Sequence, residues 1–307
     1  MAAVKRGAIV VNPTKVKDLR SVRDHLTAVF RGDGWAAPLW FETTGDEPGT
    51  AQAYDALAQH ADLLVALGGD GTVRCVAAAL LGTGVPLAVL AGGTGNLFAR
   101  QLGLPVGRYA DALRIGLAGV DTPIDAIRID LDTTGSGEFD DHHMGLVMGG
   151  IGRDADIMAD TTERLKSRIS WAAYLVAGLR QFSHELIPAT IGFDDQPPFT
   201  REVSAVLAGN CGLLQGGMRL MPDAVVDDGL LDAVVVRGSG LHWVPVFGKV
   251  LSRSRTDSTH FRRAQCAEIV VQVPRPERVE VDGDVIGTAR AARFRADRGA
   301  LTVRLPR

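Results

Sequence analysis

The sequence predicts an α/β N-terminal domain, three layers with a parallel sheet, followed by a mainly antiparallel β-sandwich. Up to about Thr122, short apolar runs alternate with helix-forming segments, which is the pattern of strand–helix–strand units. Beyond Thr122, apolar runs follow one another with turn residues between them, as in a sandwich or barrel. The length of 307 residues suits two domains better than one core.

In the first part, strands are expected over four apolar runs: Ala8–Val11, Pro38–Phe41, Leu63–Leu67 and Pro86–Leu90. Helices are expected between and after them, over Lys15–Phe30, Thr50–Gln59, Thr72–Leu81 and Asn96–Leu102. Ligands of such sheets bind beyond the carboxyl ends of the strands. The loops after the third and fourth strands are therefore the first place to look for a site.

In the second part, eight short strands are expected: Ile124–Leu131, Gly145–Met148, Ala189–Phe193, Val203–Ala208, Leu231–Val236, Glu268–Val273, Arg278–Val281 and Leu301–Leu305. One long helix, over about Thr162 to His184, carries its apolar residues on one stripe. We therefore expect domains at 1–123 and 124–307, with the last strand able to return to the first domain.

Composition excludes several classes of protein. A formal net charge of −3 gives no reason to expect a nucleic-acid binder. The three cysteines are far apart and form no CxxC pair, which argues against disulfides or zinc and fits a reducing, cytoplasmic setting. No apolar stretch approaches the roughly 18 residues of a membrane span. A lipid substrate would have to be met at the membrane surface.

The first notable turn, Gly68-Gly69-Asp70-Gly71-Thr72, joins the third strand to a helix. Glycines let peptide N–H groups approach phosphate oxygens, and the helix N-terminus adds partial positive charge. Asp70 would repel phosphate unless a divalent cation such as Mg²⁺ lay between them. Thr72 is expected to cap the helix.

A second turn, Gly92-Gly93-Thr94-Gly95-Asn96, follows the next strand. If the two strands are neighbours, the two turns lie side by side and form a nucleotide cradle. Each turn alone is also compatible with an ordinary βα connection. The chain has neither GxxxxGK[ST] nor a GxGxxG in a strand–helix–strand unit, which disfavours a Walker kinase and a standard dinucleotide dehydrogenase.

Together these turns, with Gly93-Thr94-Gly95-Asn96-Leu97-Phe98-Ala99-Arg100, resemble the diacylglycerol kinase catalytic-domain family. The resemblance spans nearly the whole chain. Asn12-Pro13 is similar to the family's opening turn, and Pro222-Asp223-Ala224 through Asp232 to its C-terminal signature. Val281-Asp282-Gly283-Asp284 falls where the family has a DGE-type turn. GGDGT by itself is shared with NAD kinases.

The resemblance implies an ATP- and Mg²⁺-dependent kinase acting on a hydroxyl of a diacylglycerol-like lipid. The family's nucleotide contacts would fall on Gly69 through Cys75, on Thr94, and on Thr44 or its neighbour Thr43. The candidate nucleotide-binding residues are Thr44, Gly68, Gly69, Asp70, Gly71, Thr72, Val73, Gly93, Thr94 and Asn96.

The resemblance also implies an acidic active-site group of Asp70, Asp125 and Asp284. A structural Mg²⁺ site would use Asp228 with the backbone carbonyls of Val225 and Leu230. Phosphoryl transfer needs a group that accepts or orients the substrate proton. Asp284 is the candidate, although the family usually has glutamate there. Taken without the resemblance, the turn Asp227-Asp228-Gly229 fits a plain hairpin better than a metal site.

The sequence also departs from the family at a few positions and contains segments that could contact a lipid. Arg74-Cys75 and Leu97 replace residues frequent in the family. Leu241–Arg263 has an apolar helical face and basic residues, so this segment could contact anionic lipid headgroups. The basic run 164–168 is a second candidate for such a contact. In both cases an ordinary amphipathic helix would show the same pattern. Asp154 matches a family position that could face the lipid head.

Two other functions stay open at this point. An NAD kinase would share the first turn and the two-domain plan. A non-catalytic lipid- or nucleotide-binding regulator would explain the departures at Arg74-Cys75 and Asp284. Exposed sandwich edges would allow a homodimer.

Overall fold

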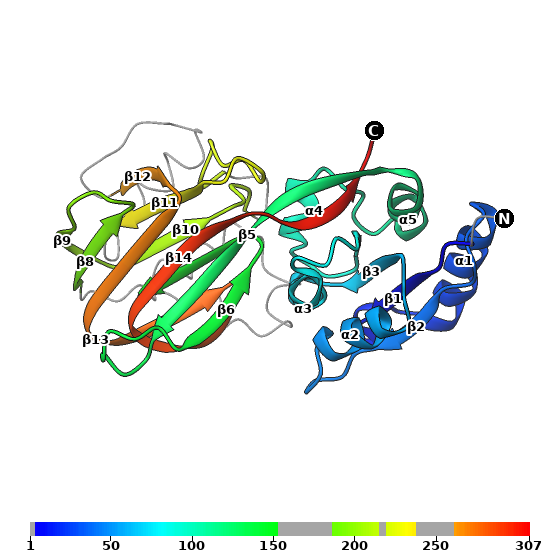
Figure 1. Ribbon diagram of the computed structural model, residues 1–307, viewed down its shortest axis with the longest axis horizontal. Helices are drawn as coiled ribbons and strands as arrows, with labels where there is room; N and C mark the ends of the chain where they lie inside the picture. The colour runs from blue at the N-terminus through cyan, green and yellow to red at the C-terminus, as the bar shows by residue number, and fades with distance from the viewer. Residues whose placement is uncertain (1–3, 153–185, 215–218, 238–260) are drawn as a thin grey trace. The chain divides into compact units, whose positions relative to one another are not determined.

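The computed structural model describes residues 4–152, 186–214, 219–237 and 261–307 (Figure 1). The chain divides into two compact units, Met1–Asp125 with Gly299–Arg307, and Ala126–Arg298. The helix predicted over 162–184, Asp154, the basic run 164–168 and residues 241–260 of the amphipathic segment lie outside the described residues. No helix among the described residues is both long and apolar enough to cross a bilayer.

The first unit is built on a parallel sheet in the order β2-β1-β3-β4. The strands are β1 (Gly7–Val11), β2 (Leu39–Glu42), β3 (Leu63–Gly68) and β4 (Leu87–Ala91). The end of β14 (Asp284–Leu305) extends this sheet, with Val303 paired to Leu87 in parallel. β1, β3 and β4 are buried throughout, which explains their continuous apolar runs.

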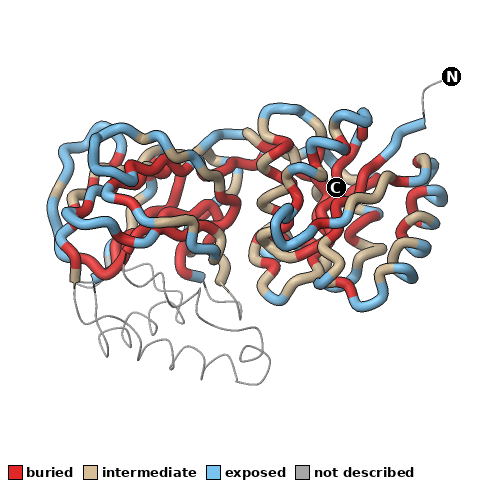
Figure 2. Tube along the Cα trace, turned by 90° about the horizontal axis from the view of Figure 1, so that it is seen from below, coloured by how far each residue is buried: buried red, intermediate tan, exposed pale blue. Residues whose placement is uncertain are grey.

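Helices cover both faces of this sheet. α1 (Leu19–Gly32) and α5 (Tyr109–Ala118) pack their apolar faces against the odd-numbered side chains of β1 and β3. α2 (Thr50–Ala58) and α3 (Asp70–Leu80) pack against each other, and α3 against β3 and β4. The short α4 (Leu97–Gln101) follows β4, and a 3₁₀ turn, η1 (Pro13–Lys15), follows β1. The result is the predicted three-layer α/β arrangement, with its buried strands red in Figure 2.

Two local predictions differ from this structure. α5 is absent from the predicted elements, because its short apolar pattern follows a loop without a strong start signal. α3 begins at Asp70, not Thr72, and Gly69 occupies its N-cap without a side-chain hydrogen bond. The prediction that Thr72 caps the helix is therefore wrong.

The second unit is a mainly antiparallel β-sandwich, as predicted. Its strands are β5 (Val120–Asp132), β6 (Asp141–Gly145), β7 (Met148–Gly152), β8 (Ile187–Phe193), β9 (Phe199–Val203), β10 (Ala205–Gly209), β11 (Leu231–Val236), β12 (Phe261–Cys266), β13 (Glu268–Val281) and most of β14. One layer runs β12-β11-β10-β7-β13, while β9-β8-β13 and β14-β5-β6 continue the pairing. Side chains such as Ile129, Val206 and Phe294 fill the core.

β13 connects two parts of the sheet, because its two halves pair with different strands. Ile269–Gln272 pairs with β8, and Val279–Val281 pairs with β7. Pairing with β14 is interrupted between Gln272 and Glu277, where Pro274 and Pro276 cannot donate ladder hydrogen bonds. The two strands predicted here are therefore one bent strand.

The strand predicted over Gly145–Met148 is wrong, because these residues contain the connection between β6 and β7. The main-chain N–H groups of Leu146, Val147 and Met148 all donate to the side chain of Asp282, at 2.8–3.0 Å. A carboxylate more than 130 residues away in the sequence thus takes hydrogen bonds that a continuous strand would have given to a neighbouring strand.

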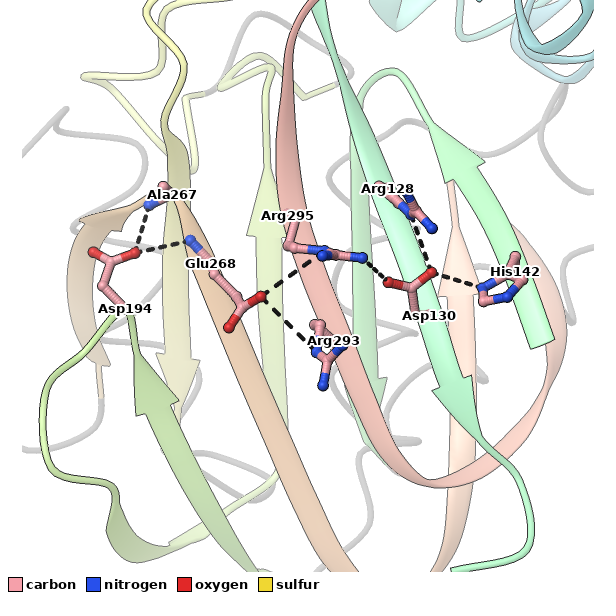
Figure 3. Close-up of polar contacts among 8 residues, drawn as sticks. All are labelled: Arg128, Asp130, His142, Asp194, Ala267, Glu268, Arg293 and Arg295. Carbon is pink, nitrogen blue, oxygen red and sulfur yellow. Dashed lines mark hydrogen bonds and ion pairs between the residues drawn. The ribbon is translucent and has the colours of Figure 1, made fainter. Parts of the chain in front are cut away.

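A charged network ties four strands of the second unit together (Figure 3). The Asp130 carboxylate on β5 lies 2.7 Å from His142 Nδ1, 2.5 Å from Arg295 Nη2 and 3.3 Å from Arg128 Nε. Arg295 also lies 3.8 Å from Glu268 of β13. The Asp130 side chain is 2% exposed. Burial acts to raise its pKa, but the hydrogen bonds from His142, Arg295 and Arg128 together lower it.

Candidate functional site

The two glycine turns lie against each other at the carboxyl ends of β3 and β4. β3 and β4 are adjacent and parallel, and Gly92 N–H donates to Gly68 O at 2.8 Å. A Cβ placed on Gly93 would come within 2.7 Å of the Gly69 Cα. Only glycine permits this approach. The structure therefore brings together the two turns that the sequence predicted as a cradle.

Asp70 connects the first turn to the helix after the second. Its Oδ1 accepts a hydrogen bond from Phe98 N–H at 3.2 Å, at the start of α4. Burial raises the pKa of Asp70, while backbone N–H groups of Leu97, Phe98 and Asn96 act against this. A partly desolvated carboxylate at this turn could hold a hard cation such as Mg²⁺.

The second turn is fixed by Asn96. Asn96 has a left-handed backbone, with φ of 49°, and is 3% exposed. Its Oδ1 accepts from Gly93 N–H at 3.0 Å, and its Nδ2 donates to Gly93 O at 2.6 Å. Asn96 therefore shapes the loop, while Thr94 is exposed on it.

Other predicted nucleotide residues are buried beneath the turns. Thr72 is 5% exposed and Val73 3% exposed. The Thr72 hydroxyl lies under Gly68, where a Cβ would meet it at 2.7 Å, and it accepts from Asn12 Nδ2 at 3.5 Å. These two side chains support the turn, and Gly69, Gly71 and their peptide groups are left as its accessible part.

The two candidate threonines after β2 differ in exposure. Thr43 is 4% exposed, and its N–H donates to Val11 O as part of the sheet. Thr44 is exposed, and its hydroxyl accepts from Glu47 N–H at 3.0 Å. The Thr44 side chain is therefore the accessible one.

One basic residue at the cradle has no role in the sequence prediction. Arg100 Nε donates to Gly95 O at 2.9 Å, which folds an exposed guanidinium back onto the second turn. An arginine four residues after the turn, within one helical turn of it, is the signal that could have pointed to it.

Asp125 is 1% exposed on β5, and its Oδ1 accepts from Gly299 N–H at 2.7 Å. It lies where β5 leaves the first unit, and Gly299 lies where β14 enters it. This hydrogen bond joins the two strands.

In the second unit, Asp284 lies at a tight hairpin between β13 and β14. Asp282 and Gly283 both have positive φ, 51° and 90°, as in a type I′ turn. Asp284 is the exposed first residue of β14, paired with Val281. The turn therefore leaves the Asp284 carboxylate accessible, while Asp282 anchors the hairpin to the β6–β7 connection.

The predicted Mg²⁺ residues lie in the loop before β11. Asp228 Oδ1 accepts from Leu230 N–H at 2.9 Å, and Val225 is 47% exposed. Buried Asp232 has its pKa raised to about 6 by burial, and also by Asp228 and Asp223. Mutually repelling carboxylates fit a cation chemically, although no group of three ligating side chains in metal-binding geometry occurs among the described residues.

Comparisons with known proteins cover both units. Residues 6–129 match the model of the diacylglycerol kinase catalytic domain, and residues 145–305 match the YegS C-terminal NAD kinase beta sandwich-like domain. The chain is 37% identical over 256 residues to the "Probable lipid kinase YegS-like" of Pseudomonas aeruginosa, covering 82% of this chain and 79% of that protein.

Solved structures show the same fold at lower identity. A diacylglycerol kinase from Bacillus anthracis str. Sterne aligns with a TM-score of 0.72 at 20% identity, covering 99% of this chain and 98% of that one. An NAD kinase from Archaeoglobus fulgidus in complex with ATP aligns with a TM-score of 0.54 at 11% identity, covering 97% and 93%. The two matched domain models, which together span most of the sequence, show that this chain belongs to the family that joins a diacylglycerol kinase catalytic domain to a YegS-type β-sandwich.

Proposed function

We propose that the protein transfers the γ-phosphoryl group of ATP to a hydroxyl of diacylglycerol or a related membrane lipid, working at the membrane surface. The observation that carries this proposal is the contact of the two glycine turns at Gly69 and Gly93. Peptide N–H groups on adjacent strand ends suit a polyphosphate. The lipid class is supported by the name of the relative from Pseudomonas aeruginosa.

In the first unit, the turn amides and the guanidinium of Arg100 would bind and orient the phosphates. Mg²⁺ would be held by Asp70 and Asp125, directly or through water. Bound Mg²⁺ would neutralise phosphate charge. The exposed Thr44 would contact the nucleotide from the neighbouring loop.

In the second unit, Asp284 would accept the proton of the acceptor hydroxyl, or orient that hydroxyl as it attacks. Its accessibility at the hairpin supports this role. Aspartate is one methylene shorter than the family's usual glutamate, so the acceptor would have to approach the turn more closely. A second Mg²⁺ at Asp228, Val225 and Leu230 would stabilise the loop before β11.

The test is a panel of acceptors incubated with [γ-³²P]ATP and Mg²⁺, separated by thin-layer chromatography. We expect label in phosphorylated lipid from dispersed diacylglycerol or a related lipid, and none in NADP from NAD. Label in NADP alone would identify an NAD kinase. ATP binding without transfer to any acceptor would identify a non-catalytic regulator.

A further inference from the structure

Glu280 is a buried acid of the second unit to which the proposed chemistry assigns no role. It lies on β13, two residues before the Asp282-Gly283 turn, and is 8% exposed. Val279 and Val281 on either side are 0% exposed and face the sandwich core. Since side chains alternate along a strand, the Glu280 side chain lies on the face of the sheet that is turned away from the sandwich core.

The cross-strand neighbours of Glu280 among the described residues are apolar. Directly opposite it on β7 is Gly150, and next across the sheet is Leu207 of β10. A Cβ on Gly150 would come within 2.5 Å of Leu207 Cδ2, so the leucine packs over the glycine. On the other side, the residue of β14 that pairs with Glu280 is Val285. No hydrogen bond to the Glu280 carboxyl is found within the described part of the chain, and its oxygens retain some exposure to solvent.

The charges around Glu280 favour its neutral form. Burial, together with the charges of Asp282 and Asp284 at the adjoining turn, raises the pKa of Glu280 to about 7. Arg278 shares its strand and face but is exposed. Asp232 of β11 and Arg263 of β12 lie three and four strands away, about 14 and 19 Å at ordinary strand spacing.

We propose that Glu280 is a specificity-determining residue that, as a carboxylic acid, donates a hydrogen bond to an acyl-ester carbonyl of the acceptor lipid. This inference rests on the proposed lipid kinase function. It identifies the acceptor class as ester-linked glycerolipids with a free hydroxyl.

Two physical considerations lead to this ligand chemistry. A largely buried carboxyl that has no hydrogen-bond partner has lost much of its solvation, and a ligand that reaches its oxygens can supply the missing partner. An ester carbonyl only accepts hydrogen bonds, so it pairs with a protonated acid, and its acyl chain suits the neighbouring leucine and valine. An ammonium ligand would instead require the ionised carboxylate, which burial and two nearby aspartates disfavour.

The experiment compares the full-length protein and its variants on dioleoylglycerol and on the dialkyl ether of the same chain length, in mixed micelles from pH 6 to 8.5. The ether retains the free hydroxyl but lacks the carbonyls. We expect wild type to prefer the ester in kcat/KM by about tenfold at pH 6, the contribution of one buried hydrogen bond. This preference should decline as the pH rises through 7, because the ionised acid cannot donate.

Glu280→Gln retains an N–H donor and should keep the preference at pH 8.5, whereas Glu280→Leu should show none at any pH. Glu277→Gln, on the same strand and also 8% exposed, is the matched control and should behave as wild type. The KM for ATP should not change in any variant. If Glu280→Leu does not fold, the pH dependence of the ester preference in wild type and Glu280→Gln still tests the proposed hydrogen bond.

Three outcomes would overturn the inference. A wild-type ester preference that does not change with pH, or that Glu280→Leu retains, excludes this hydrogen bond. Equal losses on ester and ether in the variants indicate a purely structural role. Both results leave the lipid kinase proposal intact. Wild type that phosphorylates neither lipid, nor any other acceptor, overturns the proposed function and this inference with it.

Discussion

Gly69 and Gly93 touch main chain to main chain, since a Cβ on Gly93 would come within 2.7 Å of the Gly69 Cα. The contact joins turns that are more than 20 residues apart in the sequence but follow adjacent strands. It leaves no space for any other side chain at Gly93. The separation of the two turns therefore depends directly on this glycine.

Gly93→Ala should weaken nucleotide binding, because the methyl group must push the turns apart and spoil the common orientation of their N–H groups. We expect the Kd for ATP·Mg to rise at least about tenfold, the loss of roughly one good hydrogen bond. Isothermal titration calorimetry measures it. Gly32→Ala is the matched control, because a Cβ there meets nothing within 4 Å. Unchanged affinity in Gly93→Ala would contradict the cradle.

Asp284→Ala and Asp282→Ala should separate activity from stability within one hairpin. Removal of Asp284 should abolish turnover, because Asp284 is the proposed base. It should leave the thermal midpoint nearly unchanged, because the side chain is exposed. Asp282 accepts three main-chain hydrogen bonds, so its removal should cost about 3 kcal/mol of unfolding free energy. Lipid phosphorylation and thermal melts measure the two effects. Retained activity in Asp284→Ala would exclude it as the base.

Mg²⁺ should stabilise the second unit through Asp228. A ligand at 100 times its Kd stabilises the native state by about 2.7 kcal/mol. We expect the melting temperature of wild type to rise with Mg²⁺, and that of Asp228→Asn to remain unchanged. Asp227→Asn removes the exposed neighbouring carboxylate and serves as the control. A rise in Asp228→Asn equal to that of wild type would place the cation elsewhere.

Asp130→Asn should destabilise the protein in a pH-dependent manner. The pKa of Asp130 is lowered below its usual 3.8 in the folded state, so its ionised form stabilises the fold above that pH. The stabilisation is lost as the pH falls through the folded pKa. We expect a loss of about 1–3 kcal/mol between pH 5 and 7, shrinking below about pH 4.

Urea denaturation at several pH values measures this difference. Asp195→Asn is the control, because Asp195 is an exposed turn residue of the same unit. A difference between wild type and Asp130→Asn that persists unchanged below pH 4 would show that charge is not its cause.

Much of the fold follows from local sequence. The strand over Leu63–Gly68 is a continuous apolar run that ends at the glycine turn, and the strand over Leu231–Val236 is apolar except for Asp232. The second predicted turn is equally local, because Asn96 bonds to Gly93 three residues away. The strand prediction was wrong around Gly145, because the main-chain hydrogen bonds there go to the side chain of Asp282, which is distant in the sequence.

The sequence alone thus determined the two-part α/β and β-sandwich plan, the position of both glycine turns and the family. These features depend on backbone propensity and on apolar patterns within a few residues. Only the tertiary structure decided what each acid does. Asp70 meets α4 across 28 residues, Asp125 meets Gly299 across 174, and Glu280 pairs with Gly150 of the distant strand β7. A carboxylate's partners and solvation come from residues remote in sequence, and no local pattern encodes them.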